Sequence, residues 1–126
     1  MITQYEYNAQ GYLIKAVHLD DERQPITNNR TQTLYTRDKF GNALKVEHQD
    51  KDGKPRLRSY TKAAFIRYDY NDRGQVLLIE NFGVDEEPVN LADQGWHKKV
   101  WTYSEHGAEL SATCKTVASI THPCEP

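Results

Sequence analysis

Acidic residues in two short segments are of the type that binds calcium. Asp50 and Asp52 stand in the sequence Asp-Lys-Asp-Gly, and Asp20, Asp21 and Glu22 form a similar run earlier in the chain. Carboxylate oxygens are the ligands that Ca²⁺ prefers, and an Asp-x-Asp pattern begins the calcium loop of an EF-hand. No Glu stands at the distance that such a loop requires. Because Asp and Gly three residues apart also form a type I turn, we interpret both segments as turns and expect no metal or other cofactor.

Four residues that could bind a metal or titrate recur at one position of a repeating pattern. Each lies seven residues after a glycine: His18, His48, Asn81 and Cys114. If neighbouring segments stack, His18 and His48 come close together and could form a metal-binding pair or a pH-sensitive contact. The alternative is a polar stripe at the solvated ends of strands, where an apolar core runs out. We favour the polar stripe.

Catalytic chemistry has little support in the spacing of the residues. Glu47-His48 and Glu105-His106 each place a carboxylate beside an imidazole. Neighbouring residues of a strand point to opposite faces, so these pairs do not converge. The sequence shows no Ser-His-Asp or Cys-His arrangement and no glycine-rich phosphate loop. We therefore predict that the chain is not an enzyme.

The elements that position these residues are copies of one repeat. Four segments align without a gap, with glycines 30, 33 and 33 residues apart: Tyr5–Gly11, Tyr35–Gly41, Tyr68–Gly74 and Trp101–Gly107. Asn, Asp or Ser precedes each glycine by three residues, which is typical of a type I turn followed by a glycine with positive φ. Apolar residues then occupy the third and fifth places after each glycine, as in a strand with one buried face.

A second turn follows each of the first three copies. Pro25, Pro55 and Pro88 lie fourteen residues after their glycines, each behind an acidic segment. Proline suits the start of a short edge segment because it has no amide proton to donate. We predict an all-β fold, an antiparallel meander of about four β-hairpins in an open or curled sheet. The chain forms one domain with units of about 3–32, 33–65, 66–98 and 99–126, the last with a divergent tail.

Aromatic residues form two rows across the repeat. One row starts the four segments and the other follows two places later: Tyr5, Tyr35, Tyr68 and Trp101, then Tyr7, Tyr70 and Tyr103, with Arg37 as the exception. We expect both rows to form the core, although a ladder for stacking sugar rings or a peptide is the alternative. Tyr12, Tyr60 and Trp96 fall outside the rows, and we predict that they form an exposed contact surface.

Charge and composition exclude some partners. The 16 basic and 18 acidic residues give a net charge of −2, which leaves no basic excess for binding nucleic acid. No stretch approaches the roughly 20 apolar residues of a membrane span. The two cysteines, Cys114 and Cys124, could form a disulfide or remain free thiols.

The segments Tyr5–Ile14 and Tyr68–Leu77 resemble the tyrosine-aspartate (YD or RHS-type) repeat of bacterial surface and toxin-delivery proteins. The period here is longer than the short form of that repeat. The resemblance implies a β-sheet scaffold of secreted or cell-surface bacterial proteins that does no chemistry itself. We expect a non-catalytic module that binds a protein partner or self-associates through its sheet edges. The alternative is a stand-alone protein, either an immunity-type inhibitor or a small ligand- or carbohydrate-binding protein.

Overall fold

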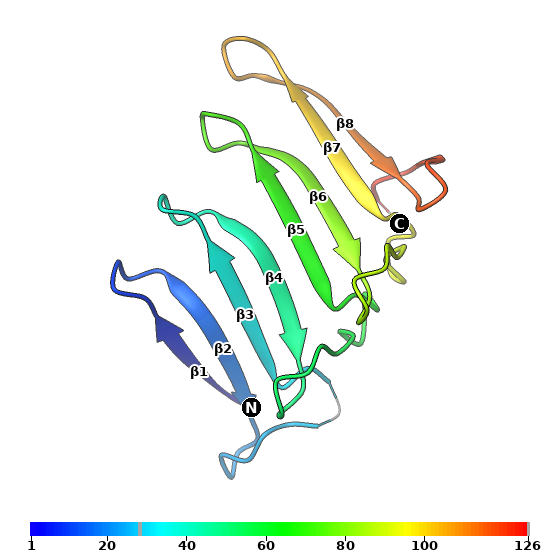
Figure 1. The fold of residues 1–126 in the computed structure, drawn as a ribbon. Helices are drawn as coiled ribbons and strands as arrows, with labels where there is room; N and C mark the ends of the chain where they lie inside the picture. Colours follow the sequence, from blue (N-terminus) through cyan, green and yellow to red (C-terminus); the bar gives the residue numbers. More distant parts are fainter. Residues whose placement is uncertain (28, 126) are drawn as a thin grey trace.

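The chain folds into a single antiparallel sheet of nine strands. The computed structural model describes residues 1–27 and 29–125. The strands follow one another in chain order across the sheet: β1 (Ile2–Tyr7), β2 (Leu13–Leu19), β3 (Gln32–Arg37), β4 (Ala43–Gln49), β5 (Phe65–Tyr70), β6 (Val76–Phe82), β7 (Lys98–Tyr103), β8 (Glu109–Lys115) and β9 (Thr121–His122). The sheet is not closed, and no helix lies among the described residues (Figure 1). The predicted open meander of hairpins is confirmed.

The turn of each hairpin has the chemistry that the sequence predicts. In the first turn, Asn8 Oδ1 accepts hydrogen bonds from the amides of Gln10 and Tyr12, both at 3.0 Å. Asp38 and Asn71 accept equivalent bonds in the second and third turns. Gly11 closes the first turn at a φ of 88°, a conformation that disfavours any other residue. A bulge beside each turn then shifts the register, for example between Glu6 and Tyr7.

Successive hairpins are joined by a shorter ladder. β1 pairs with β2 along its whole length, whereas β2 pairs with β3 only from Lys15 to Val17. Beyond that point the chain leaves the sheet for the acidic turn and returns at Pro25, which bridges to Leu19. The same bridge recurs at Pro55 and Pro88. The connections that follow these prolines therefore lie beside the strand ends that are remote from the hairpin turns.

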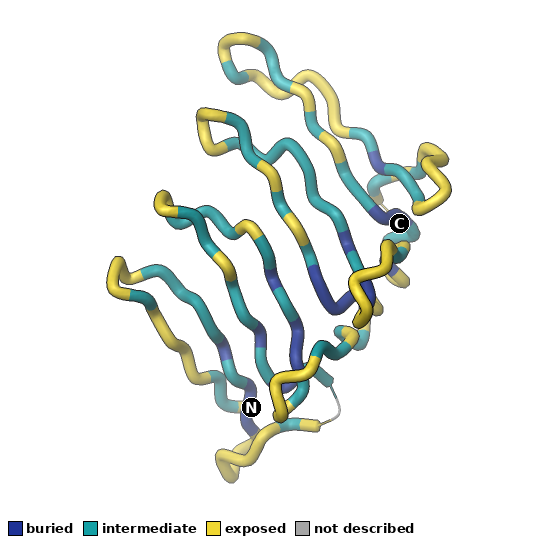
Figure 2. The backbone as a smooth tube through the Cα atoms, viewed as in Figure 1, coloured by how far each residue is buried: buried dark blue, intermediate teal, exposed yellow. Residues whose placement is uncertain are grey.

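Among the described residues, the core lies toward that end of the sheet. Buried residues gather at the ends of the strands beside the connections, whereas the residues at the hairpin-turn end are intermediate or exposed (Figure 2). We call these regions the covered end and the turn end. The sequence predicts buried apolar residues at the third and fifth places after each glycine, and this is wrong at three sites: Leu44 and Ala112 are exposed, and Leu110 keeps 67% of its surface. A single layer has nothing to pack over these positions.

The C-terminal segment completes the covered end. Cys114 and Cys124 form a disulfide, with their Cα atoms 5.3 Å apart. Trp96 is buried in a cluster with Ala63, Leu91 and Cys114. Its indole Nε1 donates to the carbonyl oxygen of Cys124 at 3.2 Å. In the part of the chain that the structure describes, no helix is long and apolar enough to span a membrane.

Candidate functional site

The face of the sheet that carries the aromatic rows is open at the turn end. We call it the aromatic face; its rows comprise Tyr5, Tyr7, Tyr35, Tyr68, Tyr70, Trp101 and Tyr103. Tyr5 and Tyr7 expose 55% and 59% of their surfaces, and the other five are half-buried. The expectation that the rows form an enclosed core is therefore wrong. The connections cover only the opposite ends of the strands, so these rings remain open above.

The chemistry of the aromatic face is that of a contact surface. The rings of Tyr68 and Tyr70 stack with their centroids 6.4 Å apart. The Arg37 guanidinium lies 5.2 Å from the centroid of the Tyr35 ring, and the Lys99 ammonium lies 4.8 Å from that of the Trp101 ring. Tyr, Trp and Arg are the residues most enriched at the energetic centres of protein interfaces, because they present large area with a polar group at the tip.

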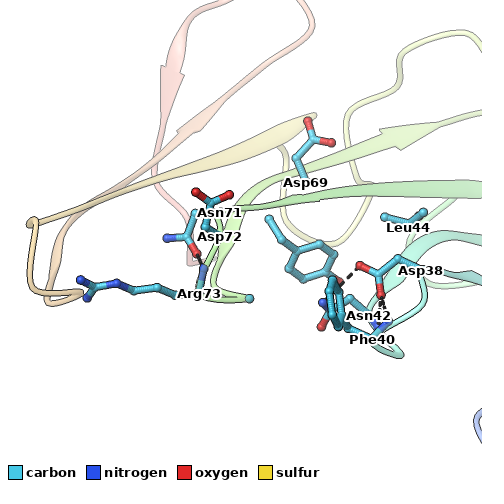
Figure 3. A pocket seen from close by; sticks show the side chains of 10 residues that line it. Asp38, Phe40, Asn42, Leu44, Asp69, Asn71, Asp72 and Arg73 are labelled. Carbon is cyan, nitrogen blue, oxygen red and sulfur yellow. Dashed lines mark hydrogen bonds between the residues drawn. The ribbon is translucent and has the colours of Figure 1, made fainter.

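A pocket lies at the turn end, between the second and third hairpin turns (Figure 3). Its volume is about 650 Å³. The lining residues come from both turns and the strands beside them: Asp38, Phe40, Asn42, Leu44, Asp69, Tyr70, Asn71, Asp72, Arg73 and Gly74. We call it the turn pocket. Three carboxylates and one guanidinium make its lining acidic.

The turn pocket exists because Asn42 bonds to its own turn and does not reach the next one. Tyr12, the residue after the first turn glycine, lies over Gly41 of the second turn; a Cβ added to Gly41 would be 2.6 Å from the Tyr12 ring. Asn42 is its equivalent one unit later, but its side-chain amide donates to Asp38 at 3.2 Å. No side chain then reaches Gly74, around which the described structure leaves open space.

The gap between the third and fourth turns is bridged instead. Gln75 donates from its side chain to the carbonyl oxygen of Gly107 at 2.8 Å. Arg73 extends away from the turn pocket toward the fourth turn and donates to the carbonyl oxygen of Glu105 at 2.5 Å (Figure 3). The second gap between turns therefore differs from the first at Asn42, and from the third at both Asn42 and Phe40, which stand where the third turn has Gln75 and Arg73.

Two titratable groups of the turn pocket are held in one protonation state near neutral pH. Burial acts to raise the pKa of Asp38, but hydrogen bonds from Asn42 and Phe40 outweigh it, and the pKa lies below its ordinary value. Burial raises the pKa of Tyr70, and the Asp38 carboxylate raises it further. Asp38 is therefore charged and Tyr70 is neutral. The Tyr70 hydroxyl already donates to the carbonyl oxygen of Ala43 at 2.7 Å.

The polar stripe lies at the covered end, not in solvent. His18, His48, Asn81 and Cys114 are all buried, and Asn81 and Cys114 are the largest side chains that are almost completely enclosed. The expectation of a solvated stripe is therefore wrong. The connections after the three prolines fold over this part of the aromatic face and exclude water. Asn81 is satisfied there because its side-chain amide donates to the carbonyl oxygen of His97 at 2.9 Å.

The two histidines of the stripe share a basic environment. His48 Nδ1 lies 3.4 Å from Thr33 Oγ1, and Arg30 Nε donates to the same oxygen at 3.2 Å. Burial, together with the charges of Arg30 and Arg58, lowers the pKa of His48 to about 4. The pKa of His18 is lowered by the same causes. The positive charges of these two guanidinium groups disfavour the binding of a divalent cation by the histidines.

The acidic turns use their carboxylates for the backbone. Asp50 Oδ1 accepts hydrogen bonds from the amides of Asp52 and Lys54 at 2.8 and 3.0 Å. Asp20 Oδ1 accepts the equivalent bonds from Glu22 and Gln24. Within residues 1–27 and 29–125, no group of three or more His, Cys, Asp or Glu side chains is placed to hold a metal ion.

The three predicted contact residues have different surroundings. Tyr60 is 75% exposed at the tip of a connection, and Tyr12 is half-buried against Gly41. Trp96 is buried, so its predicted exposure is wrong. It stands in the connection that folds over the sheet, and the disulfide-linked tail covers it. The structure does not bring these three residues together in one surface.

No protein-family model matches the chain, and no curated protein has a similar sequence.

Proposed function

We propose that the protein is a non-catalytic β-repeat module that binds a protein partner through the open part of its aromatic face. The observation that carries this proposal is the row of half-exposed aromatic side chains at the turn end, where none of the described residues forms a second layer over the sheet. Exposed aromatic surface of this extent is costly in water and is typical of an interaction site. The cations over Tyr35 and Trp101 give the face the mixed aromatic and basic character of interface centres.

The two faces of one strand provide the test. Tyr68 lies on the aromatic face of β5, and its neighbour Asp69 points to the other face. A photoreactive phenylalanine derivative is placed at position 68 in one variant and at position 69 in another, in the organism of origin. We expect a protein crosslink from position 68 and none from position 69. Equal yields from both positions, or none from either, would contradict the proposal.

The turn pocket favours a second candidate, a small-ligand or carbohydrate-binding protein. Its acidic lining and the exposed Phe40 ring suit a ligand with positive charge or an apolar face. Asn42→Tyr offers a matched test, because the new ring should cover Gly74 as Tyr12 covers Gly41. A ligand found by a thermal-shift screen of sugars and small cations would lose binding in this variant. The crosslink from position 68 would remain unchanged.

A further inference from the structure

Successive hairpins are joined by a side-chain contact that recurs at the same place. The hydroxyl of Tyr70 donates to the carbonyl oxygen of Ala43 at 2.7 Å. The hydroxyl of Tyr103 donates to the carbonyl oxygen of Val76 at 2.6 Å. In each case the acceptor is the second residue after the turn glycine of the preceding hairpin. The second aromatic row therefore anchors each hairpin to the one before it.

Arg37 makes the same contact although it breaks the aromatic row. Its Nε donates at 2.5 Å to the carbonyl oxygen of Leu13, which is the second residue after Gly11. A different side chain thus reaches the equivalent acceptor. All three internal junctions between hairpins contain this contact, which makes it a general feature of how the repeats join.

Tyr7 holds the equivalent position on β1, at the edge of the sheet. It is 59% exposed, and within the described residues its hydroxyl has no hydrogen bond and β1 has no strand on its outer side. Among the described residues, the β1 edge therefore presents an unpaired strand together with the hydroxyl donor of a repeat junction.

The opposite edge of the sheet is partly occupied by β9. His122 of β9 pairs with Cys114 of β8, at the place where Thr31 lies beside His18 in the first junction. Pro123 follows, and it has no amide proton to extend the ladder. The disulfide between Cys114 and Cys124 holds this segment against β8. A further hairpin is blocked here, so the two edges are not equivalent.

We propose that the β1 edge binds a β-hairpin of this same repeat type, supplied by another molecule. This inference rests on the proposed role as a protein-contact module and names a second, separate contact. The strand after the turn of the incoming hairpin would pair with Ile2, Thr3 and Gln4, in the register of the β2–β3 ladder. Its carbonyl two residues after the turn glycine would accept a hydrogen bond from Tyr7.

The outward amide of Thr3 provides a blocking substitution. His18 donates its amide to the carbonyl oxygen of Thr31 at 2.7 Å, and alternate pairs of an antiparallel ladder are hydrogen-bonded. The amide of Thr33 therefore points toward β2, and the equivalent amide of Thr3 points out of the sheet. Thr3→Pro removes this donor and leaves the ladder between β1 and β2 intact.

The test uses the whole chain as acceptor and an uncapped chain as donor. The donor ends at Lys115 and carries Cys114→Ser, which removes β9, together with Thr3→Pro, which blocks its own β1 edge. We expect a one-to-one complex in sedimentation velocity. Thr3→Pro in the acceptor should abolish it, and Tyr7→Phe should weaken it about two- to tenfold, as expected for one lost hydrogen bond. A folded donor that forms no complex, or a complex insensitive to both substitutions, overturns the inference.

A covalent version decides the question if the uncapped donor does not fold. A copy of residues 65–99 is joined directly before Gln4, because Lys99 and Thr3 are equivalent in the repeat. We expect slower amide exchange in β1 than in the natural chain. Tyr7→Phe should lower the melting temperature of the extended chain and leave that of the natural chain unchanged. Equal effects in both chains, or unchanged exchange in β1, overturn the inference.

The two proposals fail separately. Loss of the position-68 crosslink with an intact β1 complex would contradict the aromatic face as a docking surface and leave the edge contact standing. A crosslink without any β1 complex would do the reverse.

Discussion

The covered end and the turn end of the sheet are built from the same strands but differ in what surrounds them. At the covered end, connections and the disulfide-linked tail enclose even a polar side chain such as His48, which keeps 4% of its surface. At the turn end, Tyr5 keeps 55%. Both residues lie on the aromatic face. Burial therefore depends on whether a connection folds over a position, and not on how apolar its side chain is.

This difference separates the end of the sheet that supplies most of the stability from the end whose surface is open to contact. A single layer can bury apolar area only where another segment covers it, so most of the hydrophobic stabilisation should come from the covered end. The turn end is held by backbone ladders, side-chain caps and the junction contacts of Arg37, Tyr70 and Tyr103. It can bind or change its surface without loss of the core.

The sharpest test of this division compares the two tryptophans. Trp96→Ala removes the largest side chain of the buried cluster and should lower the free energy of unfolding by about 3–5 kcal/mol. Trp101→Ala acts on the half-open aromatic face and should cost about 1 kcal/mol, since part of its ring already meets water. Urea denaturation measures both, with the remaining tryptophan as the fluorescence reporter in each variant. Similar losses would show that the aromatic face is as much a core as the covered end.

Acid should weaken the covered end first. The pKa of His48 is lowered to about 4 in the folded chain from an ordinary value of 6.5, because burial and the charges of Arg30 and Arg58 oppose its protonation. Between these values the unfolded chain binds more protons, so the free energy of unfolding falls as the pH falls from 6.5 toward 4. We expect a loss of about 1–3 kcal/mol from this residue across that range. Thermal melts at a series of pH values measure it.

The repeat provides the matched variants for this pH test. Asn81 occupies the position equivalent to His48, so His48→Asn introduces a residue that the fold already accepts there. It should flatten the dependence of the melting temperature on pH between 6.5 and 5. His106 lies in solvent with 88% of its side chain exposed, and His106→Asn should leave the dependence unchanged. An equal slope in the natural chain and in His48→Asn would contradict a buried neutral imidazole.

The sequence predicts the hairpins well because their signals are local. Asn8, Asp38 and Asn71 make their turn hydrogen bonds within four residues, so spacing alone reveals them. The order of the strands follows from the same repetition. The burial of the polar stripe could not be predicted, because it depends on connections of variable sequence that fold over His18 and His48. The burial of Trp96 could not be predicted for the same reason.

The candidate sites are less predictable because they depend on differences between repeats. The turn pocket arises because the second unit has the smaller Asn42 where the first unit has Tyr12. Only the structure shows that Asn42 bonds to Asp38. Arg37 appeared as an exception in the aromatic row. Leu13, Ala43 and Val76 align in the sequence two places after their glycines. Their role as acceptors could not be predicted, because the acceptor is the backbone carbonyl, which every residue has.

The smallest predicted effect distinguishes two turns at the exposed end. Gly74 and Gly107 have φ values of 77° and 90°, and alanine at either position should cost about 1 kcal/mol for the left-handed conformation alone. Around Gly74 there is open space, whereas a Cβ at Gly107 would lie 2.3 Å from Arg73 Nη1. Gly107→Ala should therefore cost about 0.5–1.5 kcal/mol more, through loss of the bond from Arg73 to Glu105. In an Arg73→Ala background this excess should vanish, and chemical denaturation of the four variants measures it. An excess that persists would mean that the bond from Arg73 to Glu105 does not stabilise the junction between the third and fourth turns.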